Sequence, residues 1–448
     1  MSSTAVLPRS AVDPQAVRTS LSRHLLVDGY DLVLDLARSQ GSWLVDARDG
    51  RRYLDMFTFF ASGALGMNHP ALTENPDLRG DLERAARTKV SNSDVYTVEM
   101  ARFVDTFARV LGVPDLPHLF FIEGGGPAVE NALKVAFDWK SRRNEAAGRD
   151  PALGTKVLHL RHAFHGRTGY TLSLTNTEPI KTARFPQFDW PRIDSPAVAF
   201  PLEEHLADVE RAEATSLAQA RAAFETHPHD IACFIAEPIQ GEGGDRHLRP
   251  EYLQAMQDLC HTYDALFVLD EVQTGCGLTG STWAFQQLGL EPDVVAFGKK
   301  TQVCGVMAGR RVDLVRDNVF AVSSRLNSTW GGNLADMVRA RGILEVIEAE
   351  RLVAAAAARG AHLQDGLRNL EREFPDLVSN ARGRGLMCAF SLPSGAVRDE
   401  VLRRCREDES LFLLGCGRDS VRWRPALTVT DEELVLALDK VRSVLQSL

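Results

Sequence analysis

The stretch ALFVLDEVQTG, residues 265–275, decides the fold of this chain. Its first five residues are all apolar and lack the alternation of a strand with one face in solvent, which indicates burial on both faces. Strands of this kind, separated by helical segments, predict an α/β fold in which helices flank a mostly parallel sheet. Similar apolar runs occur at residues 118–123 (HLFFIE), 156–160 (KVLHL), 231–238 (IACFIAEP) and 294–298 (VVAFG).

The segments that flank this region have a different character. Residues 41–56 predict a hairpin that turns near Asp49 and Gly50. Near the C-terminus, Thr430 and Glu433 form a capping box that begins the final helix. The chain has 448 residues, which is more than one hydrophobic core usually holds. We predict an N-terminal segment (1–65) that is part of a small domain, a large ligand-binding domain (66–333) and a C-terminal small α+β domain (334–448).

The composition narrows the class of protein. The net charge of −9, without a basic tract, argues against a nucleic-acid partner. The chain has neither an apolar run of about 18 residues nor an N-terminal signal pattern, so we expect no membrane contact and a cytoplasmic location. The seven cysteines stand singly, without the spacing of a metal site, and predict reduced thiols and no bound metal.

Four features lie at the predicted carboxyl ends of buried strands, where parallel sheets bind ligands. Gly124 to Gly126 open a helix whose free N–H groups can hold a phosphate, or else form a plain turn. Asp270 ends the 265–269 run, where a carboxylate needs a partner such as a protonated ring nitrogen, or else caps a turn. Phe164, after the 156–160 run, can stack on a flat cofactor or be an ordinary core residue.

The fourth feature is Lys299, whose amine can form a Schiff base. The alternative is a solvated pair, Lys299 and Lys300. The segment also faintly suggests a nucleotide P-loop, but that motif needs Gly where Asp293 stands and Ser or Thr where Lys300 stands. Together the phosphate site, the ring, the carboxylate and the lysine follow the chain order of the large enzyme fold that binds pyridoxal-5′-phosphate (PLP).

Over nearly its whole length the sequence resembles the class III (omega) aminotransferases, and within them the bacterial L-lysine 6-aminotransferases. AEPIQGEGG (236–244) and LDEVQTGCG (269–277) are specific to class III, whereas FGKKTQVCGVMAGRR (297–311) and FDWKSR (137–142) look specific to the lysine enzymes. The resemblance implies the PLP-dependent transferase fold type I, with a seven-stranded sheet in the large domain and PLP as the cofactor.

The resemblance also implies how the cofactor is held. Lys299 would form the Schiff base, and Asp270 would pair with the ring nitrogen. Val272 and Phe164 would pack on opposite faces of the ring. The remaining cofactor contacts would be Gln273 at the ring 3-oxygen, the backbone of Gly125 and Gly126 at the phosphate, and Thr329 at the phosphate of the neighbouring subunit. Each active site would then depend on a homodimer.

The implied reaction moves the ε-amino group of L-lysine to 2-oxoglutarate. Its products are L-glutamate and 2-aminoadipate 6-semialdehyde, which closes to piperideine-6-carboxylate. Arg422 would clamp the keto-acid carboxylate, and Glu242 would pair with Arg422 while lysine reacts, unless the two form a fixed salt bridge. Arg167 would anchor the distal carboxylate with help from Asn327, and Glu237 would orient the site.

This chain departs from the family pattern at the cofactor site. Gly124 to Gly126 stand where many members have Ser-Gly-Thr or Ser-Gly-Ser, so backbone donors must do more. Residues 300–304 stand where many members have a glycine-rich run, so either Lys299 or Lys300 could be the Schiff-base lysine. The match of residues 293–298 to the family pattern favours Lys299. Two other functions stay open: an ω-aminotransferase for ornithine, acetylornithine or 4-aminobutyrate, and a PLP-binding protein without turnover.

Overall fold

The five apolar runs predicted as buried strands lie side by side in one sheet. The computed structural model of the chain describes residues 12–448, so the first eleven residues of the predicted N-terminal segment lie outside the described part. The described sheet has seven strands, and β11 runs antiparallel to both of its neighbours while the others are parallel. The predicted seven-stranded, mostly parallel sheet and the α/β class are therefore confirmed. The strand order is β3 (His118–Ile122), β11 (Cys304–Ala308), β10 (Val294–Phe297), β9 (Leu266–Asp270), β6 (Ile231–Ala236), β4 (Lys156–Leu160) and β5 (Arg192–Ile193).

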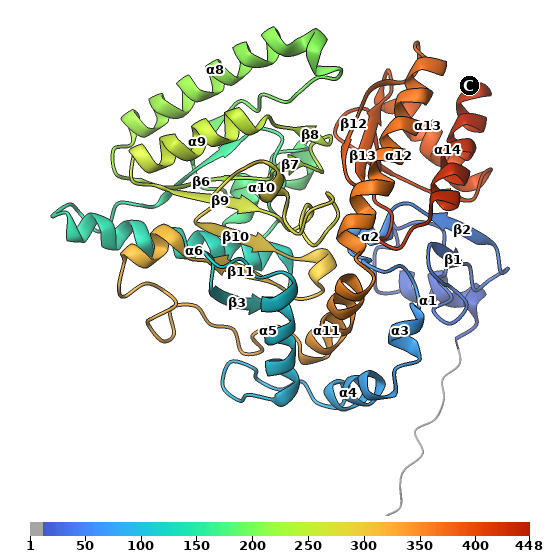
Figure 1. Cartoon of the computed structure of the whole chain (residues 1–448), viewed down its shortest axis with the longest axis horizontal. Helices are drawn as coiled ribbons and strands as arrows, with labels where there is room; N and C mark the ends of the chain where they lie inside the picture. Colours follow the sequence, from blue (N-terminus) through green and yellow to red (C-terminus); the bar gives the residue numbers. More distant parts are fainter. Residues whose placement is uncertain (1–11) are drawn as a thin grey trace, which may run out of the picture.

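Side chains of each strand alternate between two core layers on opposite faces of the sheet. The main helices of this region are α4 (Pro76–Arg87), α5 (Val98–Val110), α6 (Gly125–Ala146), α8 (Leu202–Thr226) and α9 (Pro250–Thr262). From β9, Leu266 and Val268 pack in the layer of α6, whereas Phe267 and Leu269 pack in the layer of α9. Figure 1 shows α8 and α9 on one side of the sheet and α6 on the other.

The N-terminal and C-terminal parts of the chain share a second sheet. As predicted, β1 (Trp43–Val45) and β2 (Arg52–Asp55) form a hairpin, and β14 (Leu411–Phe412) then pairs in parallel with β2. A separate antiparallel sheet follows the order β12 (Ser379–Arg384), β13 (Met387–Ser391), β16 (Ser420–Trp423) and β15 (Leu414–Cys416). It is accompanied by α12 (Leu352–Glu373), α13 (Gly395–Glu407) and α14 (Asp431–Gln446). The predicted capping box of Thr430 and Glu433 begins α14.

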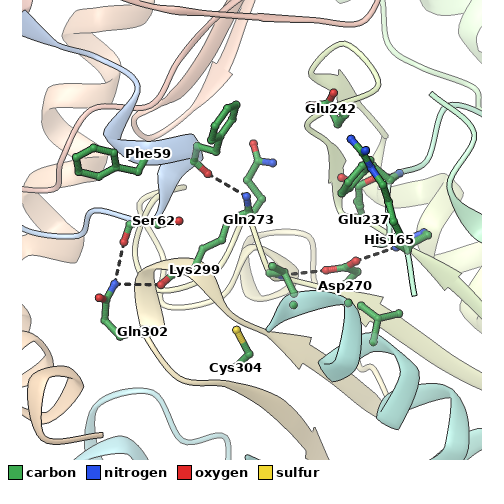
Figure 2. Close-up of a pocket in the computed structure, with 18 of the residues that line it drawn as sticks. Phe59, Ser62, His165, Glu237, Glu242, Asp270, Gln273, Lys299, Gln302 and Cys304 are labelled. Carbon is green, nitrogen blue, oxygen red and sulfur yellow. Dashed lines mark hydrogen bonds and ion pairs between the residues drawn. The ribbon is translucent and has the colours of Figure 1, made fainter. Parts of the chain in front are cut away.

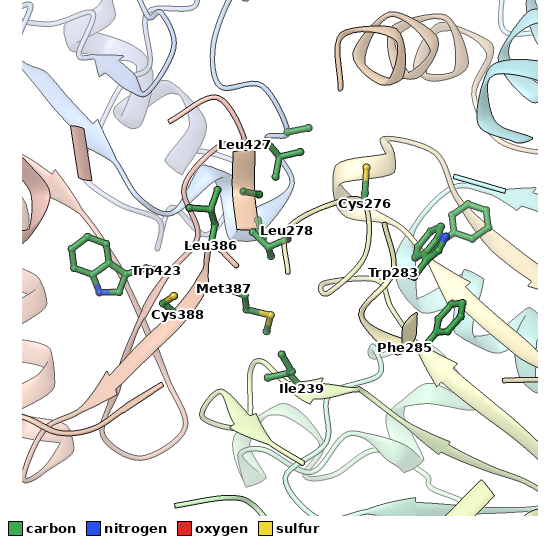
Figure 3. Close-up of a cluster of buried hydrophobic side chains, with 14 of the residues drawn as sticks. Ile239, Cys276, Leu278, Trp283, Phe285, Leu386, Met387, Cys388, Trp423 and Leu427 are labelled. Atoms are coloured by element: carbon green, nitrogen blue, oxygen red, sulfur yellow. The ribbon is translucent and has the colours of Figure 1, made fainter. Parts of the chain in front are cut away.

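The hydrophobic core continues across the predicted border between the large and small domains. Figure 3 shows Leu386 and Met387, next to and within β13, packed near Leu278 and Ile239 of the large region. The Leu386 N–H also donates to the Leu278 carbonyl at 2.9 Å. Helix α11 (Leu334–Ala349) contacts α4 and α5 as well as α12. The domain boundaries at residues 65 and 333 stay a prediction.

Short elements complete the described chain. None of the helices in residues 12–448 combines the length and the apolarity that a membrane crossing requires. The remaining α-helices and strands are α1 (Val17–Ser22), α2 (Thr58–Ala61), α3 (Pro70–Thr73), α7 (Thr171–Leu174), α10 (Ala284–Gln287), β7 (Ile239–Gln240) and β8 (Arg246–His247). Short 3₁₀ helices lie at Pro14–Ala16, Pro179–Lys181, Lys299–Thr301 and Arg310–Leu314.

Candidate active site

A cavity of about 630 Å³ lies beyond the carboxyl ends of β4, β6, β9 and β10. Such an edge is where a parallel sheet brings together side chains from distant parts of the chain. Of the twelve residues predicted as site residues, Asn327 and Thr329 do not line the cavity. The other ten do: Gly125, Gly126, Phe164, Arg167, Glu242, Asp270, Val272, Gln273, Lys299 and Arg422. Figure 2 shows the cavity with Lys299, Asp270, Gln273 and Glu242 around it.

The carboxylate of Asp270 is buried but paired. The Nδ1 of His165 lies 2.8 Å from its Oδ2, and the Val272 N–H donates to its Oδ1 at 3.0 Å. Burial favours the neutral imidazole, but the bond from His165 to Asp270 and the charge of that carboxylate outweigh it and raise the pKa of His165. The two groups form a buried pair, and both residues line the cavity.

Glu237 links two loops at the cavity wall. Its carboxylate accepts the Phe164 N–H at 3.0 Å through Oε1 and the Gly241 N–H at 3.1 Å through Oε2. Burial raises the pKa of Glu237 to about 7, against the opposing effect of the nearby His165 charge. With both oxygens engaged by backbone donors, the carboxyl connects the segments that carry Phe164 and Glu242, and the orienting role expected from the sequence stays a prediction.

Lys299 and Lys300 differ in access to the cavity. The Nζ of Lys299 lines the cavity and donates to the Phe60 carbonyl at 3.0 Å, as Figure 2 shows. Lys300 is fully buried away from it and donates to the Ala61 carbonyl at 2.9 Å. Burial and the charge of Arg422 lower the pKa of Lys299 to about 8, and burial lowers that of Lys300 to about 7. The lower pKa belongs to Lys300, but of the two amines only that of Lys299 belongs to a residue that lines the cavity and can meet a ligand there.

The helix α6 begins at the cavity without a side-chain cap. Gly124 precedes it in a left-handed conformation (φ 99°), and the N–H groups of the first turn are free of a capping side chain. A Cβ at Gly125 would lie 3.0 Å from Val272, and one at Gly126 would lie 3.3 Å from Thr168. The glycines therefore keep the backbone open at a helix N-terminus, which suits a phosphate.

A buried polar chain orients Gln273. The Nε of Arg424 donates to Gln273 Oε1 at 3.0 Å, and the guanidinium also pairs with Asp245. Both members of that ion pair are fully buried. Because a guanidinium can only donate, it fixes the amide oxygen of Gln273 on its own side and leaves the amide nitrogen available to a ligand at the cavity.

Glu242 and Arg422 form the ion pair that the sequence predicts. The Nη2 of Arg422 lies 3.0 Å from Glu242 Oε2. Arg422 is almost wholly buried, yet its Nε has no protein acceptor among the described residues, so it keeps a spare donor. Burial opposes ionisation of Glu242, but the charge of Arg422 and a bond from Lys181 hold the pKa of Glu242 below its ordinary value. The guanidinium can therefore serve either this carboxylate or another one.

Asn327 and Thr329 lie in an exposed loop outside the cavity of their own chain. Side chains from the segment after α4 hold the loop: Asn92 donates to the Trp330 carbonyl at 2.9 Å and Ser93 donates to the Ser328 carbonyl. The side chain of Lys89 lies 3.7 Å from the centre of the Trp330 ring. These contacts tie the loop to the segment after α4, and neither Asn327 nor Thr329 lines the cavity.

Three residues that contact the predicted site were missed from the sequence. His165 directly follows Phe164 at the same sheet edge, a position that could have marked it as a partner for Asp270. Arg424 lies two residues after Arg422 and directly after the end of β16, and in extended chain this two-residue spacing favours the same face for both side chains. Lys181 lies in a short 3₁₀ turn without periodicity, and no sequence signal points to it.

The residues at this cavity fit PLP. The cofactor has a flat ring with a protonatable nitrogen, an aldehyde and a phosphate, and these need a carboxylate, an amine and anion-binding N–H groups. Asp270, Lys299 and the glycine-opened start of α6 provide those groups around one cavity. In the described part of the chain no cluster of His, Cys, Asp or Glu has the arrangement of a metal site.

Comparisons with known proteins agree with this geometry. The model of the family "Aminotransferase class-III" matches residues 27–445. The L-lysine-epsilon aminotransferase of Mycobacterium tuberculosis is 66% identical over 432 residues, which is 96% of each chain. That of Streptomyces clavuligerus is 58% identical over 429 residues, covering 96% of this chain and 94% of the relative. The solved lysine aminotransferase from M. tuberculosis has a TM-score of 0.96 at 65% identity, covering 97% of this chain and all of that one.

The buried pair of Arg424 and Asp245 gives a stability test. Replacing Arg424 with Met leaves Asp245 as a buried charge without its partner and should lower the free energy of unfolding by about 3–5 kcal/mol. Urea unfolding followed by circular dichroism measures it. Arg424→Met combined with Asp245→Leu should recover part of the loss, and Arg418→Met, at a side chain 84% exposed, serves as the control. A loss in Arg424→Met no larger than in Arg418→Met would contradict the assignment.

Proposed function

The chain belongs to the class III aminotransferases, a family of PLP-dependent enzymes, and within it we propose that this chain is an L-lysine 6-transaminase. It would transfer the ε-amino group of L-lysine to 2-oxoglutarate and release 2-aminoadipate 6-semialdehyde and L-glutamate. The 66% identity to a relative named for lysine supports the amino donor. The structural observation that carries the proposal is the ion pair of Glu242 and Arg422 at the cavity.

That pair suits two unlike substrates in one site. Lysine presents its ε-amine to the reacting centre and has no carboxylate beside it, so Arg422 would be an unpaired buried cation without Glu242. 2-Oxoglutarate has a carboxylate beside its keto carbon, and the spare Nε of Arg422 could bind it once Glu242 moves aside. Arg167, which also lines the cavity, would anchor the distal carboxylate of either substrate, and Asn327 of the neighbouring subunit would assist.

The cofactor would be held by the groups that surround the cavity. Lys299 would bind its aldehyde, Asp270 its ring nitrogen and Gln273 its ring oxygen. Phe164 and Val272 would cover the two ring faces, and the N–H groups of Gly125 and Gly126 would bind the phosphate. When bound, PLP supplies the electron sink that makes cleavage of a C–H bond next to nitrogen possible.

Lys299 has a second task as a proton carrier. Its Nζ would take the proton from the substrate carbon that bears the reacting amine and would deliver it to C4′ of the cofactor, the carbon of the former aldehyde. A general base works best when its pKa lies near the working pH, and burial with the charge of Arg422 lowers the pKa of Lys299 to about 8. Glu237 would hold the surrounding backbone still through its bonds to Phe164 and Gly241.

We also propose that the enzyme is a homodimer with shared sites. Thr329 and Asn327 lie outside the cavity of their own chain, so a second subunit would have to present them. Exposed apolar side chains near that loop, including Tyr96 and Trp330, form a surface that a subunit would cover. All seven cysteines are free thiols, which supports the expected cytoplasmic location.

The runner-up within the family is an ω-aminotransferase for ornithine, acetylornithine or 4-aminobutyrate. The cofactor groups would be the same, and only the distal part of the cavity would differ. A PLP-binding protein without turnover is the other alternative, but such a protein has no need for a carboxylate that can exchange with substrate at Arg422.

Substrate ranking tests the proposal. With 2-oxoglutarate as acceptor, kcat/KM for L-lysine should exceed that for ornithine, acetylornithine and 4-aminobutyrate by about tenfold or more, which is about 1.4 kcal/mol of selectivity. Glutamate release measured by a coupled assay gives the ranking. If ornithine outperformed lysine tenfold the lysine assignment would be wrong, and a yellow protein that reacts with no amine would favour the binding protein.

The lysine assignment has its own test. Lys299→Met should lose the cofactor absorbance band at about 400–430 nm after dialysis, and with it the activity. Lys300→Met should keep the band, because Lys300 lies away from the cavity and bonds to Ala61, although loss of its buried bonds will lower stability. Borohydride reduction and peptide mapping locate the labelled residue. A label on Lys300 would move the site by one position.

The pH dependence of cofactor capture follows from the environment of Lys299. Only a neutral amine attacks an aldehyde, so capture of PLP by the apoenzyme should be slow at low pH and speed up as the amine loses its proton. The midpoint should lie at a pH of about 8 rather than at the ordinary lysine value of 10.5. The rate at which the absorbance band appears after mixing is measured from about pH 6 to about pH 11, a range that spans both midpoints. The pH at which this rate is half of its maximum distinguishes the lowered pKa of Lys299 from the ordinary lysine value. A midpoint above about 10 would mean that Lys299 is solvated.

A further inference from the structure

Glu242 has a second cationic partner in addition to Arg422. The Nζ of Lys181 lies 2.5 Å from Glu242 Oε1, while Arg422 engages Oε2 at 3.0 Å. The Lys181 side chain is only 12% exposed, and its Nζ lies 5.8 Å from the centre of the Phe164 ring. Lys181 is not among the residues that line the cavity, whereas Glu242 and Arg422 are. The carboxylate therefore bridges two cations that are largely shielded from solvent.

The charges of these three side chains do not balance. Lys181 and Arg422 carry two positive charges against one negative charge on Glu242. The fourth group in contact is Glu178, whose carboxylate lies 3.0 Å from Lys181, but its side chain is 51% exposed and water screens it. One more negative charge at Arg422 would complete two pairs, and a substrate carboxylate supplies that charge.

We propose that Lys181 is a positioning residue that retains Glu242 when a substrate carboxylate takes its place on Arg422. This inference rests on the proposed function, because it deepens the exchange between Glu242 and substrate. Without Lys181, displacement would leave Glu242 as a partly buried carboxylate with no cationic partner, and that cost would oppose binding of the keto acid. With Lys181 in place, Glu242 loses one of two partners and stays ionised. The two-partner arrangement also favours the charged carboxylate, in agreement with the lowered pKa of Glu242.

The inference predicts an effect on one substrate only. Lysine places no carboxylate at Arg422, so Glu242 keeps both partners during the lysine half-reaction. 2-Oxoglutarate requires the exchange, so its binding should depend on Lys181. A merely structural role, in which Lys181 ties the 178–181 turn to the 242 segment, would change both half-reactions alike.

The experiment uses the holoenzyme and follows each half-reaction by the absorbance of the cofactor in stopped flow. In Lys181→Met the apparent Kd for 2-oxoglutarate should rise about tenfold or more, the size expected for loss of a charged hydrogen bond. The rate and apparent Kd with lysine should stay within about threefold of the wild type. Lys181→Arg keeps a cation at this position and should restore most of the 2-oxoglutarate affinity, which also guards against a variant that folds poorly.

Two controls isolate the contact with Glu242. Lys440→Met removes a partly buried lysine that pairs with Glu409 at 3.8 Å, far from the cavity, and should change neither half-reaction. In a Glu242→Gln background there is no charge for Lys181 to retain, so Lys181→Met should alter the 2-oxoglutarate affinity by less than about threefold. A full tenfold effect in that background would overturn the inference.

Failure of the inference and failure of the lysine assignment look different. Equal losses in both half-reactions of Lys181→Met, or no loss in either, would overturn the role of Lys181 while lysine remained the donor. A wild-type enzyme that takes no amino group from lysine would overturn the donor assignment. The best-ranked ω-amine would then replace lysine in the same comparison, and the ratio between the half-reactions would still decide whether Lys181 retains Glu242.

Discussion

The parallel pairing of β9 with β10 is the constraint on which the rest of the site depends. Its register sets Ala296 opposite Asp270, so the carboxylate ends one strand where the neighbouring strand is about to leave the sheet. The chain then passes Gly298, where a Cβ would lie 2.8 Å from Cys304 Sγ, and reaches Lys299. Lys299 itself adopts a left-handed backbone (φ 54°), a conformation that costs an L-residue about 1–3 kcal/mol. The sheet thus places an acid and an amine at one cavity and holds the amine in a strained position.

Three carboxylates at and near this edge are each paired with at least one cation or histidine. Asp270 meets His165, Glu242 meets Arg422 and Lys181, and Asp245 meets Arg424. Burying any one of these ions alone would cost several kcal/mol. In each pair the two partners come from segments that are distant in the sequence. Two of the pairs join residues 242–245 to residues 422–424 near the C-terminus, so contacts between these distant parts of the chain form part of the site.

Much of the fold and most of the site could be predicted, for identifiable reasons. Uninterrupted apolar runs such as residues 265–269 predict central strands, because a strand that is buried on both faces needs apolar side chains on both. Strand β11 was missed, since CGVMA follows the lysine loop directly and has no turn signal of its own. Lys181 was missed because its role comes from pairing across the fold and leaves no local pattern, whereas His165 and Arg424 lie next to predicted site residues in the sequence and could have been found from that position. Asn327 and Thr329 were predicted only through the family resemblance, and one chain by itself does not bring them to its cavity.

The pairing of β2 with β14 has a consequence for folding during synthesis on the ribosome. Leu54 pairs with Leu411, and the Met56 carbonyl accepts a hydrogen bond from the Arg424 N–H. These contacts of an early segment can form only after the C-terminal part of the chain has been synthesised. Strand β16, which carries Arg422 and is followed directly by Arg424, is among the last elements to emerge. A chain that stops before β16 contains every strand of the central sheet but lacks Arg422 at the cavity. Such a chain has all the residues of this subunit that are proposed to hold the cofactor, but not the arginine proposed to bind a substrate carboxylate, so the substrate clamp is the last part of the site to be made.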